Sequence, residues 1–123
     1  MHGSRTLVLK SRRAALAAST GLLLTLAAQL ANAECSATGC DNARILQLYT
    51  EANGNIYVQL SGTMSNLNCT RVSGVYVTLQ PIGRFKEIYA TLLATQIADR
   101  TLSVRINDGS AGCTIAYVNS ISS

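Results

Sequence analysis

The segment that decides the fold runs from Val75 to Ile106 and reads VYVTLQPIGRFKEIYATLLATQIADRTLSVRI. Its first part, Val75–Gln80, alternates apolar and polar residues, as a half-buried strand does. Pro81 follows, and proline ends a strand because it cannot donate a hydrogen bond to the sheet. Phe85–Ala98 has the 3.6-residue period of an amphipathic helix, and Thr101–Ile106 alternates again. The segment therefore predicts a strand, a helix and a strand.

The predicted helix carries one apolar stripe, which we expect to pack on the sheet. The members of this stripe are Phe85, Ile88, Tyr89, Leu92, Leu93 and Ile97. In the strand before the helix, alternation places Val75, Val77 and Leu79 inward. In the strand after it, Leu102, Val104 and Ile106 take the inward positions.

Three further strands are predicted outside this segment. Arg44–Thr50 and Asn55–Ser61 flank the sequence Glu51-Ala52-Asn53-Gly54, whose Asn and Gly accept positive φ, and we expect them to form a hairpin. Cys113–Ile121 is the last predicted strand. Glu34–Asn42 is assigned only as an N-terminal segment bracketed by cysteines.

The resulting order, β-β-β-α-β-β, is the order of the OB-fold, a small and partly open barrel with one helix. The fold class is therefore mainly β with one helix. An open α+β sheet with one packed helix is the alternative. We favour the barrel, because closure leaves few open edges on so short a chain.

Residues 1–33 have the pattern of a removable secretion signal. Four basic residues precede an apolar run, Ala14–Leu30, which ends at the small-x-small motif Ala31-Asn32-Ala33. The alternative is an uncleaved anchor, but the run is shorter than the roughly 20 apolar residues that span a bilayer. We predict cleavage after Ala33 and a periplasmic or secreted domain, residues 34–123, that is not embedded in a membrane. Ser11-Arg12-Arg13 leaves the twin-arginine route open beside the favoured general secretory route.

Removal of the leader changes the charge of the protein. The chain has ten basic and six acidic residues, and four of the basic residues lie in the leader. The remaining six basic residues balance the six acidic ones, so the predicted mature domain is neutral. A neutral domain lacks the positive surface that nucleic acid requires, and we expect no nucleic-acid partner.

All four cysteines, Cys35, Cys40, Cys69 and Cys113, lie after the predicted cleavage site. An even number of cysteines in a small exported protein is typical of disulfides, and four cysteines allow three pairings. We favour Cys35–Cys40 and Cys69–Cys113. The alternative, a four-cysteine metal site, fits poorly because the spacing is unlike that of zinc sites. We expect no metal and no cofactor.

The predicted mature domain contains no histidine, since His2 lies in the leader. This excludes the catalytic triads that depend on histidine and removes the usual general base near neutral pH. The acidic residues are scattered along the sequence, and the cysteines are expected to be oxidised. We therefore expect a protein that is not an enzyme.

If the alternation is correct, one sheet surface carries a mixture of aromatic and polar side chains. Its predicted members are Tyr57, Gln59, Tyr76, Thr78, Gln80, Ser103 and Arg105. Such a mixture suits sugars, which combine apolar ring faces with hydroxyl groups. It also suits a subunit interface, where Tyr and Arg are enriched. An ordinary solvated strand face is the third interpretation.

The layout resembles the exported OB-fold binding subunits of AB5 toxins, in particular the subtilase-cytotoxin and pertussis-like branch. The shared features are the signal peptide, the domain size, the order of strands and helix, and a disulfide from a mid-chain loop at Cys69 to a late segment at Cys113. The resemblance implies pentameric rings that bind cell-surface glycans. We carry no sugar-contacting residue over from it.

These observations together predict an exported, non-catalytic binding module that forms homo-oligomers and recognises glycans. The alternative is a structural or protein-interaction factor of the cell envelope. The two hypotheses predict different partners. The first predicts a glycan and a second copy of the chain, and the second predicts another protein.

Overall fold

The computed structural model describes residues 32–120 of the chain. The predicted signal peptide therefore lies outside the described residues except for its last two positions. Within the described part, no helix is both long enough and apolar enough to cross a membrane.

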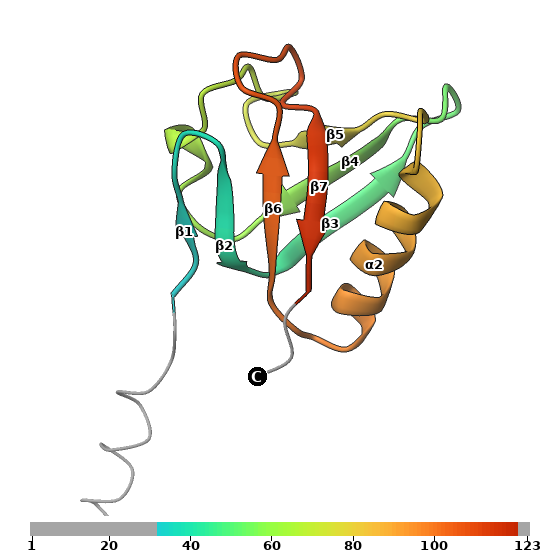
Figure 1. Cartoon of the computed structure of the whole chain (residues 1–123), viewed down its shortest axis with the longest axis horizontal. Helices are drawn as coiled ribbons and strands as arrows, with labels where there is room; N and C mark the ends of the chain where they lie inside the picture. Colours follow the sequence, from blue (N-terminus) through green and yellow to red (C-terminus); the bar gives the residue numbers. More distant parts are fainter. Residues whose placement is uncertain (1–31, 121–123) are drawn as a thin grey trace, which may run out of the picture. The chain divides into compact units, whose positions relative to one another are not determined.

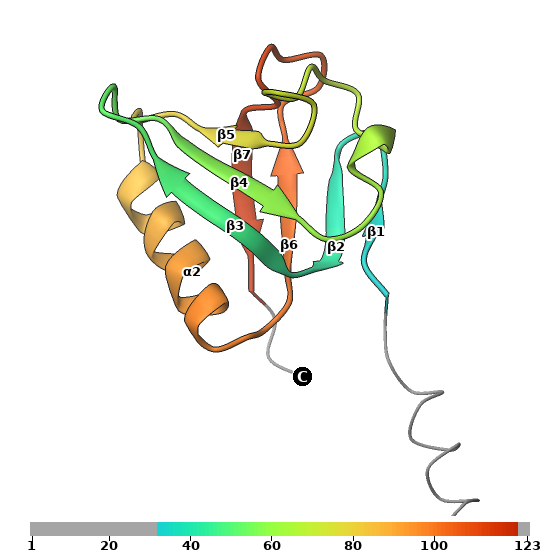
Figure 2. The same cartoon turned by 180° about the vertical axis from the view of Figure 1, so that it is seen from behind.

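The described chain forms two antiparallel sheets and one α-helix (Figure 1). The elements are β1 (Glu34–Cys35), β2 (Gly39–Ala43), β3 (Ile45–Thr50), β4 (Ile56–Leu60), η1 (Met64–Asn66), β5 (Val77–Leu79), α2 (Phe85–Ile97), β6 (Leu102–Ile106) and β7 (Ile115–Asn119). One sheet has the strand order β1-β2-β6-β7 and the other has the order β3-β4-β5. Figure 2 shows the second sheet crossing obliquely over the first.

The two sheets are linked at one side by the chain itself. β2 runs into β3 with only Arg44 between them, yet β2 pairs with β6 and β3 pairs with β4. A bulge between Cys40 and Ala43, where Asn42 has φ 51°, redirects the chain from one sheet to the other.

At the other side the sheets meet at a single parallel bridge between Thr78 and Thr114. The amide of Thr78 donates to the carbonyl of Cys113 at 3.0 Å. Beyond this bridge the strands separate, and α2 lies beside the gap and contacts both β3 and β7 (Figures 1 and 2). The fold is therefore mainly β with one helix, as predicted, but the two sheets do not close into a barrel.

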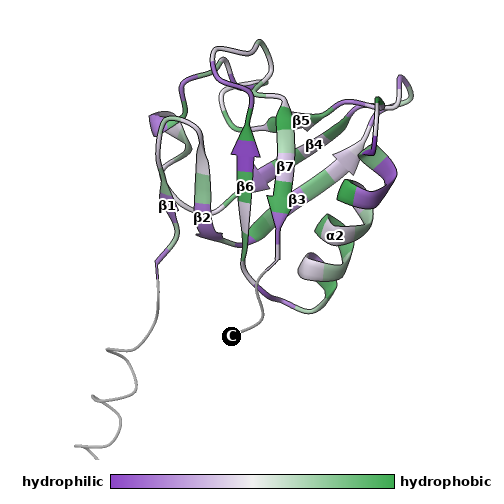
Figure 3. Ribbon diagram, in the orientation of Figure 1, coloured by the Kyte–Doolittle hydropathy of each residue, from purple (hydrophilic) through white to green (hydrophobic). Residues whose placement is uncertain are grey.

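The core lies between the two sheets and the helix. Its largest fully buried side chains come from both sheets, from α2 and from the disulfides, and they are Leu92, Val58, Val77, Val104, Cys40 and Cys113. Figure 3 shows the expected alternation of hydrophobic and hydrophilic residues along β6, where Leu102, Val104 and Ile106 face the core. β6 buries every second residue, whereas Tyr57 of β4 and Thr78 of β5 are buried on the outer face of their sheet.

Both favoured disulfides are present in the structure, Cys35–Cys40 and Cys69–Cys113. The first joins directly opposed residues of β1 and β2. The second joins the loop after η1 to the segment before β7. Disulfides of this kind are typical of exported proteins.

Three details of the fold differ from the prediction. The N-terminal segment contains two strands, β1 and β2, because β2 finds a pairing partner in the distant β6. The strand predicted to start at Val75 starts at Val77, and the side chain of Val75 is 38% exposed. Ile97 is 83% exposed, although it was assigned to the buried stripe. At about 100° per residue, Ile97 lies about 140° around the helix from the buried Leu92.

Candidate functional site

The outer face of the β3-β4-β5 sheet gathers aromatic and amide side chains. Tyr49 of β3 is in register with Tyr57 of β4, which is in register with Thr78 of β5. One step further along the same face, Gln47 is in register with Gln59. Two-residue periodicity thus places these side chains on one surface.

Three tyrosine rings pack together on this face. The ring centroids of Tyr49 and Tyr57 are 5.0 Å apart, and those of Tyr49 and Tyr76 are 5.2 Å apart in an edge-to-face arrangement. Tyr57 and Tyr76 are 6.4 Å apart. Aromatic pairs at these separations stabilise each other by about 0.5–1.5 kcal/mol beyond the burial of their surface. The cluster therefore holds its rings in fixed orientations.

Hydrogen bonds orient two of the three tyrosines. The hydroxyl of Tyr76 donates to Oε1 of Gln47 at 3.0 Å, and this contact spans β4. The hydroxyl of Tyr57 donates to Oε2 of Glu51 at 3.4 Å and accepts from Nδ2 of Asn55 at 3.3 Å. The hydroxyl of Tyr49 has no hydrogen-bond partner among the described residues. It is therefore the phenol best placed to bond a ligand.

The pKa of Tyr49 is raised above its ordinary value by desolvation and, to a smaller extent, by the negative charges that Tyr76, Glu51 and Tyr57 can carry. A raised pKa keeps the phenol protonated well above neutral pH. Tyr49 can therefore serve as a hydrogen-bond donor at every physiological pH. We call Gln47, Tyr49, Gln59 and Tyr76 the tyrosine face.

The surface predicted from the sequence is only partly correct. Gln59 and Tyr76 do lie on the tyrosine face, but Tyr57 is 7% exposed and Thr78 is 5% exposed, so neither offers much surface to a ligand. Tyr57 is covered by the neighbouring rings. The hydroxyl of Thr78 is used within the protein, since it donates to the carbonyl of Gly112 at 2.8 Å.

The other three predicted members lie elsewhere. Ser103 and Arg105 belong to β6, which is part of the other sheet. Gln80 is exposed just after β5 and lines a separate depression beside Ile82 and Arg84. Conversely, the prediction missed Gln47 and Tyr49. A bulge between Ile45 and Gln47 shifts the alternation of β3 and hides them from a simple period-2 pattern.

Ser103 and Arg105 form a polar group with Asp41 on the outer face of the β1-β2-β6-β7 sheet. Oδ1 of Asp41 accepts from Oγ of Ser103 at 2.8 Å and from Nη2 of Arg105 at 2.9 Å. The hydrogen bond from Ser103 and, to a smaller extent, the hydrogen bond from Arg105 hold the pKa of Asp41 below its ordinary value. The Arg105 side chain reaches Asp41 by passing over Gly39. A Cβ atom at position 39 would overlap both the Arg105 side chain and the carbonyl oxygen of Val104. The group therefore ties β2 to β6.

Replacing Asp41 by Asn should destabilise the domain at pH 7 by up to about 1 kcal/mol, the usual limit for a solvent-exposed ion pair. The carboxylate of Asp41 has a lower pKa in the folded state than the roughly 3.9 of an unfolded chain. Its contribution is therefore present above pH ~4 and is lost as the pH falls through the folded-state pKa. Urea unfolding should show that Asp41→Asn and wild type differ less in their free energy of unfolding at pH 2 than at pH 7.

The matched control for this prediction is Glu87→Gln, because Glu87 is 3.5 Å from Arg84 in a pair that is largely exposed. We expect Glu87→Gln to change the free energy of unfolding less than Asp41→Asn does at pH 7. An Asp41→Asn variant as stable as wild type at pH 7 would contradict the assigned role of the group.

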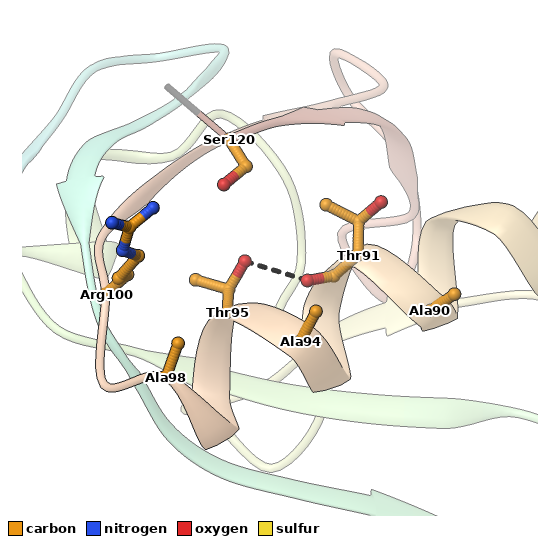
Figure 4. Close-up of a pocket in the computed structure, with 7 residues that line it drawn as sticks. All are labelled: Ala90, Thr91, Ala94, Thr95, Ala98, Arg100 and Ser120. Atoms are coloured by element: carbon orange, nitrogen blue, oxygen red, sulfur yellow. Dashed lines mark hydrogen bonds between the residues drawn. The ribbon is translucent and has the colours of Figure 1, made fainter. Parts of the chain in front are cut away.

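Two larger depressions lie on the described surface. The first, of about 470 Å³, is a shallow trough along α2 (Figure 4). It is lined by Ala90, Thr91, Ala94, Thr95, Ala98, Arg100 and Ser120. The hydroxyls of Thr91 and Thr95 donate to helix carbonyls at 3.1 and 2.7 Å, so their protons are used within the helix and they can only accept from a ligand. We assign no site to this trough.

The second depression, of about 540 Å³, adjoins the tyrosine face. It is lined by Leu46, Gln59, Leu60, Ser61, Gly62, Thr63, Met64, Ser65, Arg71 and Val75, and we call it the Leu46–Val75 pocket. Gln59 belongs to both the pocket and the tyrosine face. The two features therefore form one continuous surface.

Comparisons with protein-family models, with curated proteins and with solved structures find no match to this chain. Among the described residues, no group of three His, Cys, Asp or Glu side chains is arranged to hold a metal ion. Function must therefore be argued from the geometry of the site itself.

Proposed function

We propose that this protein is an exported, non-catalytic binding module that recognises a glycan through the tyrosine face. The observation that carries the proposal is the packing of Tyr49 and Tyr76 at 5.2 Å beside two glutamines in adjacent strands. The rings offer apolar surface to the faces of a sugar. Gln47, Gln59 and the Tyr49 hydroxyl offer hydrogen bonds to sugar hydroxyls. Because Gln47, Tyr49 and Gln59 stand on the paired strands β3 and β4, they need little reordering on binding.

The strand connections support an OB-like fold for this module. β2 and β3 act as one bent strand that pairs with β6 in its first half and with β4 in its second. The helix falls between β5 and β6, and the parallel Thr78–Thr114 bridge joins the two sheets. An OB-fold is itself a partly open barrel, so the gap beside α2 is compatible with this assignment.

Export is supported by the two disulfides and by the leader pattern of residues 1–33. We propose a periplasmic or secreted location, with cleavage after Ala33. An oxidising compartment would keep both disulfides formed. This location would also bring the tyrosine face into contact with surface polysaccharides.

Self-association of the domain is part of this proposal. β3 and β7 are end strands of their sheets and contain no charged residue, and α2 contacts both strands and so covers part of each edge. Uncovered strand edges without charges are templates for pairing with another chain. We propose that copies of the domain associate through the parts of these edges that α2 leaves free, and pairing of β3 in one copy with β7 in the next would generate a ring if the rotation closes.

A glycan array with the mature domain should give positive spots, and Tyr49→Ala should weaken them by about tenfold or more, as loss of a central aromatic contact does. Tyr117→Ala is the matched control, because Tyr117 is exposed on β7 of the other sheet. A blank array with wild type, or equal losses in Tyr49→Ala and Tyr117→Ala, would overturn the glycan proposal.

Size-exclusion chromatography with light scattering tests the ring. We expect a discrete oligomer whose mass is a multiple of that of residues 34–123. A monomer at high protein concentration would contradict the ring while leaving the glycan proposal in place.

The second candidate function is a protein-interaction factor of the cell envelope. It is favoured by exposed apolar side chains away from the tyrosine face, among them Ile82 and Ile97. This candidate predicts a stable protein partner in a pull-down from the periplasm. It also predicts that Ile82→Asp or Ile97→Asp releases that partner while Tyr49→Ala does not.

A further inference from the structure

We infer that a signal peptidase cuts the bond between Ala33 and Glu34 before the domain folds, because folding packs this bond against Gly62 and places Glu34 in β1. The inference rests on the proposed export and on the proposed cleavage after Ala33. It adds the order of cleavage and folding. This order favours the general secretory route, in which the chain crosses the membrane unfolded, over the twin-arginine route, which serves proteins that fold before export.

The bond to be cut lies on a packed part of the domain. A Cβ atom added to Gly62, which follows β4, would lie 3.1 Å from the Cβ of Ala33 and 3.4 Å from the carbonyl carbon of Ala33. In hydrolysis, water adds to this carbonyl carbon, the C–N bond to Glu34 breaks, and the products are the carboxylate of Ala33 and the amine of Glu34. Gly62 therefore covers one side of the atom that the peptidase has to reach.

The residues after the bond belong to the sheet. β1 begins at Glu34, so no linker separates the bond from the first strand. Glu34 is directly opposed to Asp41, and Cys35 is directly opposed to Cys40, with which it forms a disulfide. Cys35 is only 8% exposed. These contacts hold the chain in place immediately after the bond to be cut.

β1 is the end strand of its sheet (Figure 1), but it also contacts η1. Nδ2 of Asn66, the last residue of η1, donates to the carbonyl of Cys35 at 3.1 Å. Extended peptides are commonly recognised by adding a strand to the sheet of their receptor, through hydrogen bonds of the main chain. The hydrogen bond from Asn66 occupies a main-chain acceptor that such pairing with the peptidase would use. Cleavage of the folded chain would therefore require local opening of β1.

The need for opening makes cleavage of the folded precursor slow. When opening and closing are fast, the rate of proteolysis follows the population of the open form. Opening of β1 breaks its pairing with β2, the hydrogen bond from Asn66 and the contact at Gly62. We expect the folded precursor to be cut at least about tenfold more slowly than a precursor whose cleavage site is free.

The test uses the full chain, residues 1–123, purified in detergent with both disulfides formed and incubated with a bacterial signal peptidase. In one variant, a flexible linker of about six residues, Glu followed by Gly and Ser, is inserted between Ala33 and Glu34. The linker frees the site, keeps Glu as the residue after the cut and leaves the domain folded. This variant should be cut after Ala33 at least about tenfold faster than wild type.

The matched control carries the same linker between Asn53 and Gly54, in the turn that joins β3 to β4. This control should be cut as slowly as wild type. A Cys35→Ala/Cys40→Ala variant should be cut faster than wild type, because β1 then opens without a covalent tie to β2.

The outcomes separate the inference from the proposed export, with mass spectrometry of the products locating the cut and thermal unfolding showing that each precursor is folded. A folded wild-type precursor that is cut as fast as the variant with the linker after Ala33 would overturn the inference and leave the export proposal in place. Equal acceleration in the control would also overturn the inference, because the effect would then come from general loosening of the domain. If the variant with the freed site were not cut after Ala33, the proposed cleavage site itself would be wrong.

Discussion

Removing the Cys69–Cys113 disulfide by replacing both cysteines with Ala should lower the free energy of unfolding by about 4 kcal/mol. The bond closes a loop with a sequence separation of 44 residues, and longer loops lose more conformational entropy when they are closed in the unfolded chain. In a domain of this size the melting temperature should fall by roughly 15–30 °C. Thermal unfolding of residues 34–123 with the other disulfide intact measures this effect.

The disulfide acts together with backbone hydrogen bonds between the same two loops. The amide of Thr70 donates to the carbonyl of Ser110 at 3.0 Å, and the amide of Gly112 donates to the carbonyl of Thr70 at 2.6 Å. Cys113 itself is fully buried in the core. Loss of the bond should therefore loosen the segment that leads into β7 and its bridge to Thr78.

The control for this prediction is the Cys35→Ala/Cys40→Ala variant. Its loop has a sequence separation of 5, so its loss should cost only about 2 kcal/mol. A larger effect for the short loop than for the long one would contradict the loop-entropy explanation. It would indicate instead that β1 and β2 depend on their disulfide for pairing.

The strands that could be predicted from the sequence are those in which aliphatic residues occupy every second position. β4 and β6 lie within the ranges Asn55–Ser61 and Thr101–Ile106, because their apolar residues alternate without interruption. β2 could not be predicted, since GCDNA lacks a run of β-branched or aromatic residues. Its strand conformation depends on pairing with β6, which is about 60 residues away in the sequence.

The candidate site was harder to predict than the strands. Alternation tells which side of its own strand a residue occupies, but not to which sheet the strand belongs. Ser103 and Tyr57 were therefore placed together, although they lie on different sheets. Tyr49 was missed because the bulge in β3 is set by its pairing with β4 rather than by local sequence.

The second large effect on stability is expected in α2. Two apolar residues of its predicted stripe lie in opposite environments. Leu92 is fully buried between the helix and the sheets, whereas Ile97 is largely exposed. Leu92→Ala should destabilise the domain by about 2–5 kcal/mol, because the cavity that it leaves adds to the lost burial of the side chain. Ile97→Ala should change stability by less than about 0.5 kcal/mol, as surface substitutions usually do.

Urea unfolding of the two variants at the same pH tests this difference. If both residues were buried in one apolar stripe, as the sequence predicts, the two variants would lose similar free energies of unfolding. Alanine has the highest helix propensity, so any effect of propensity in Ile97→Ala is stabilising and cannot imitate a packing loss. A loss above about 2 kcal/mol in Ile97→Ala would therefore mean that the last turn of α2 is covered in solution. Since Ile97 is exposed in the single chain, such a cover would have to come from a second copy or another partner, and the loss would then depend on protein concentration.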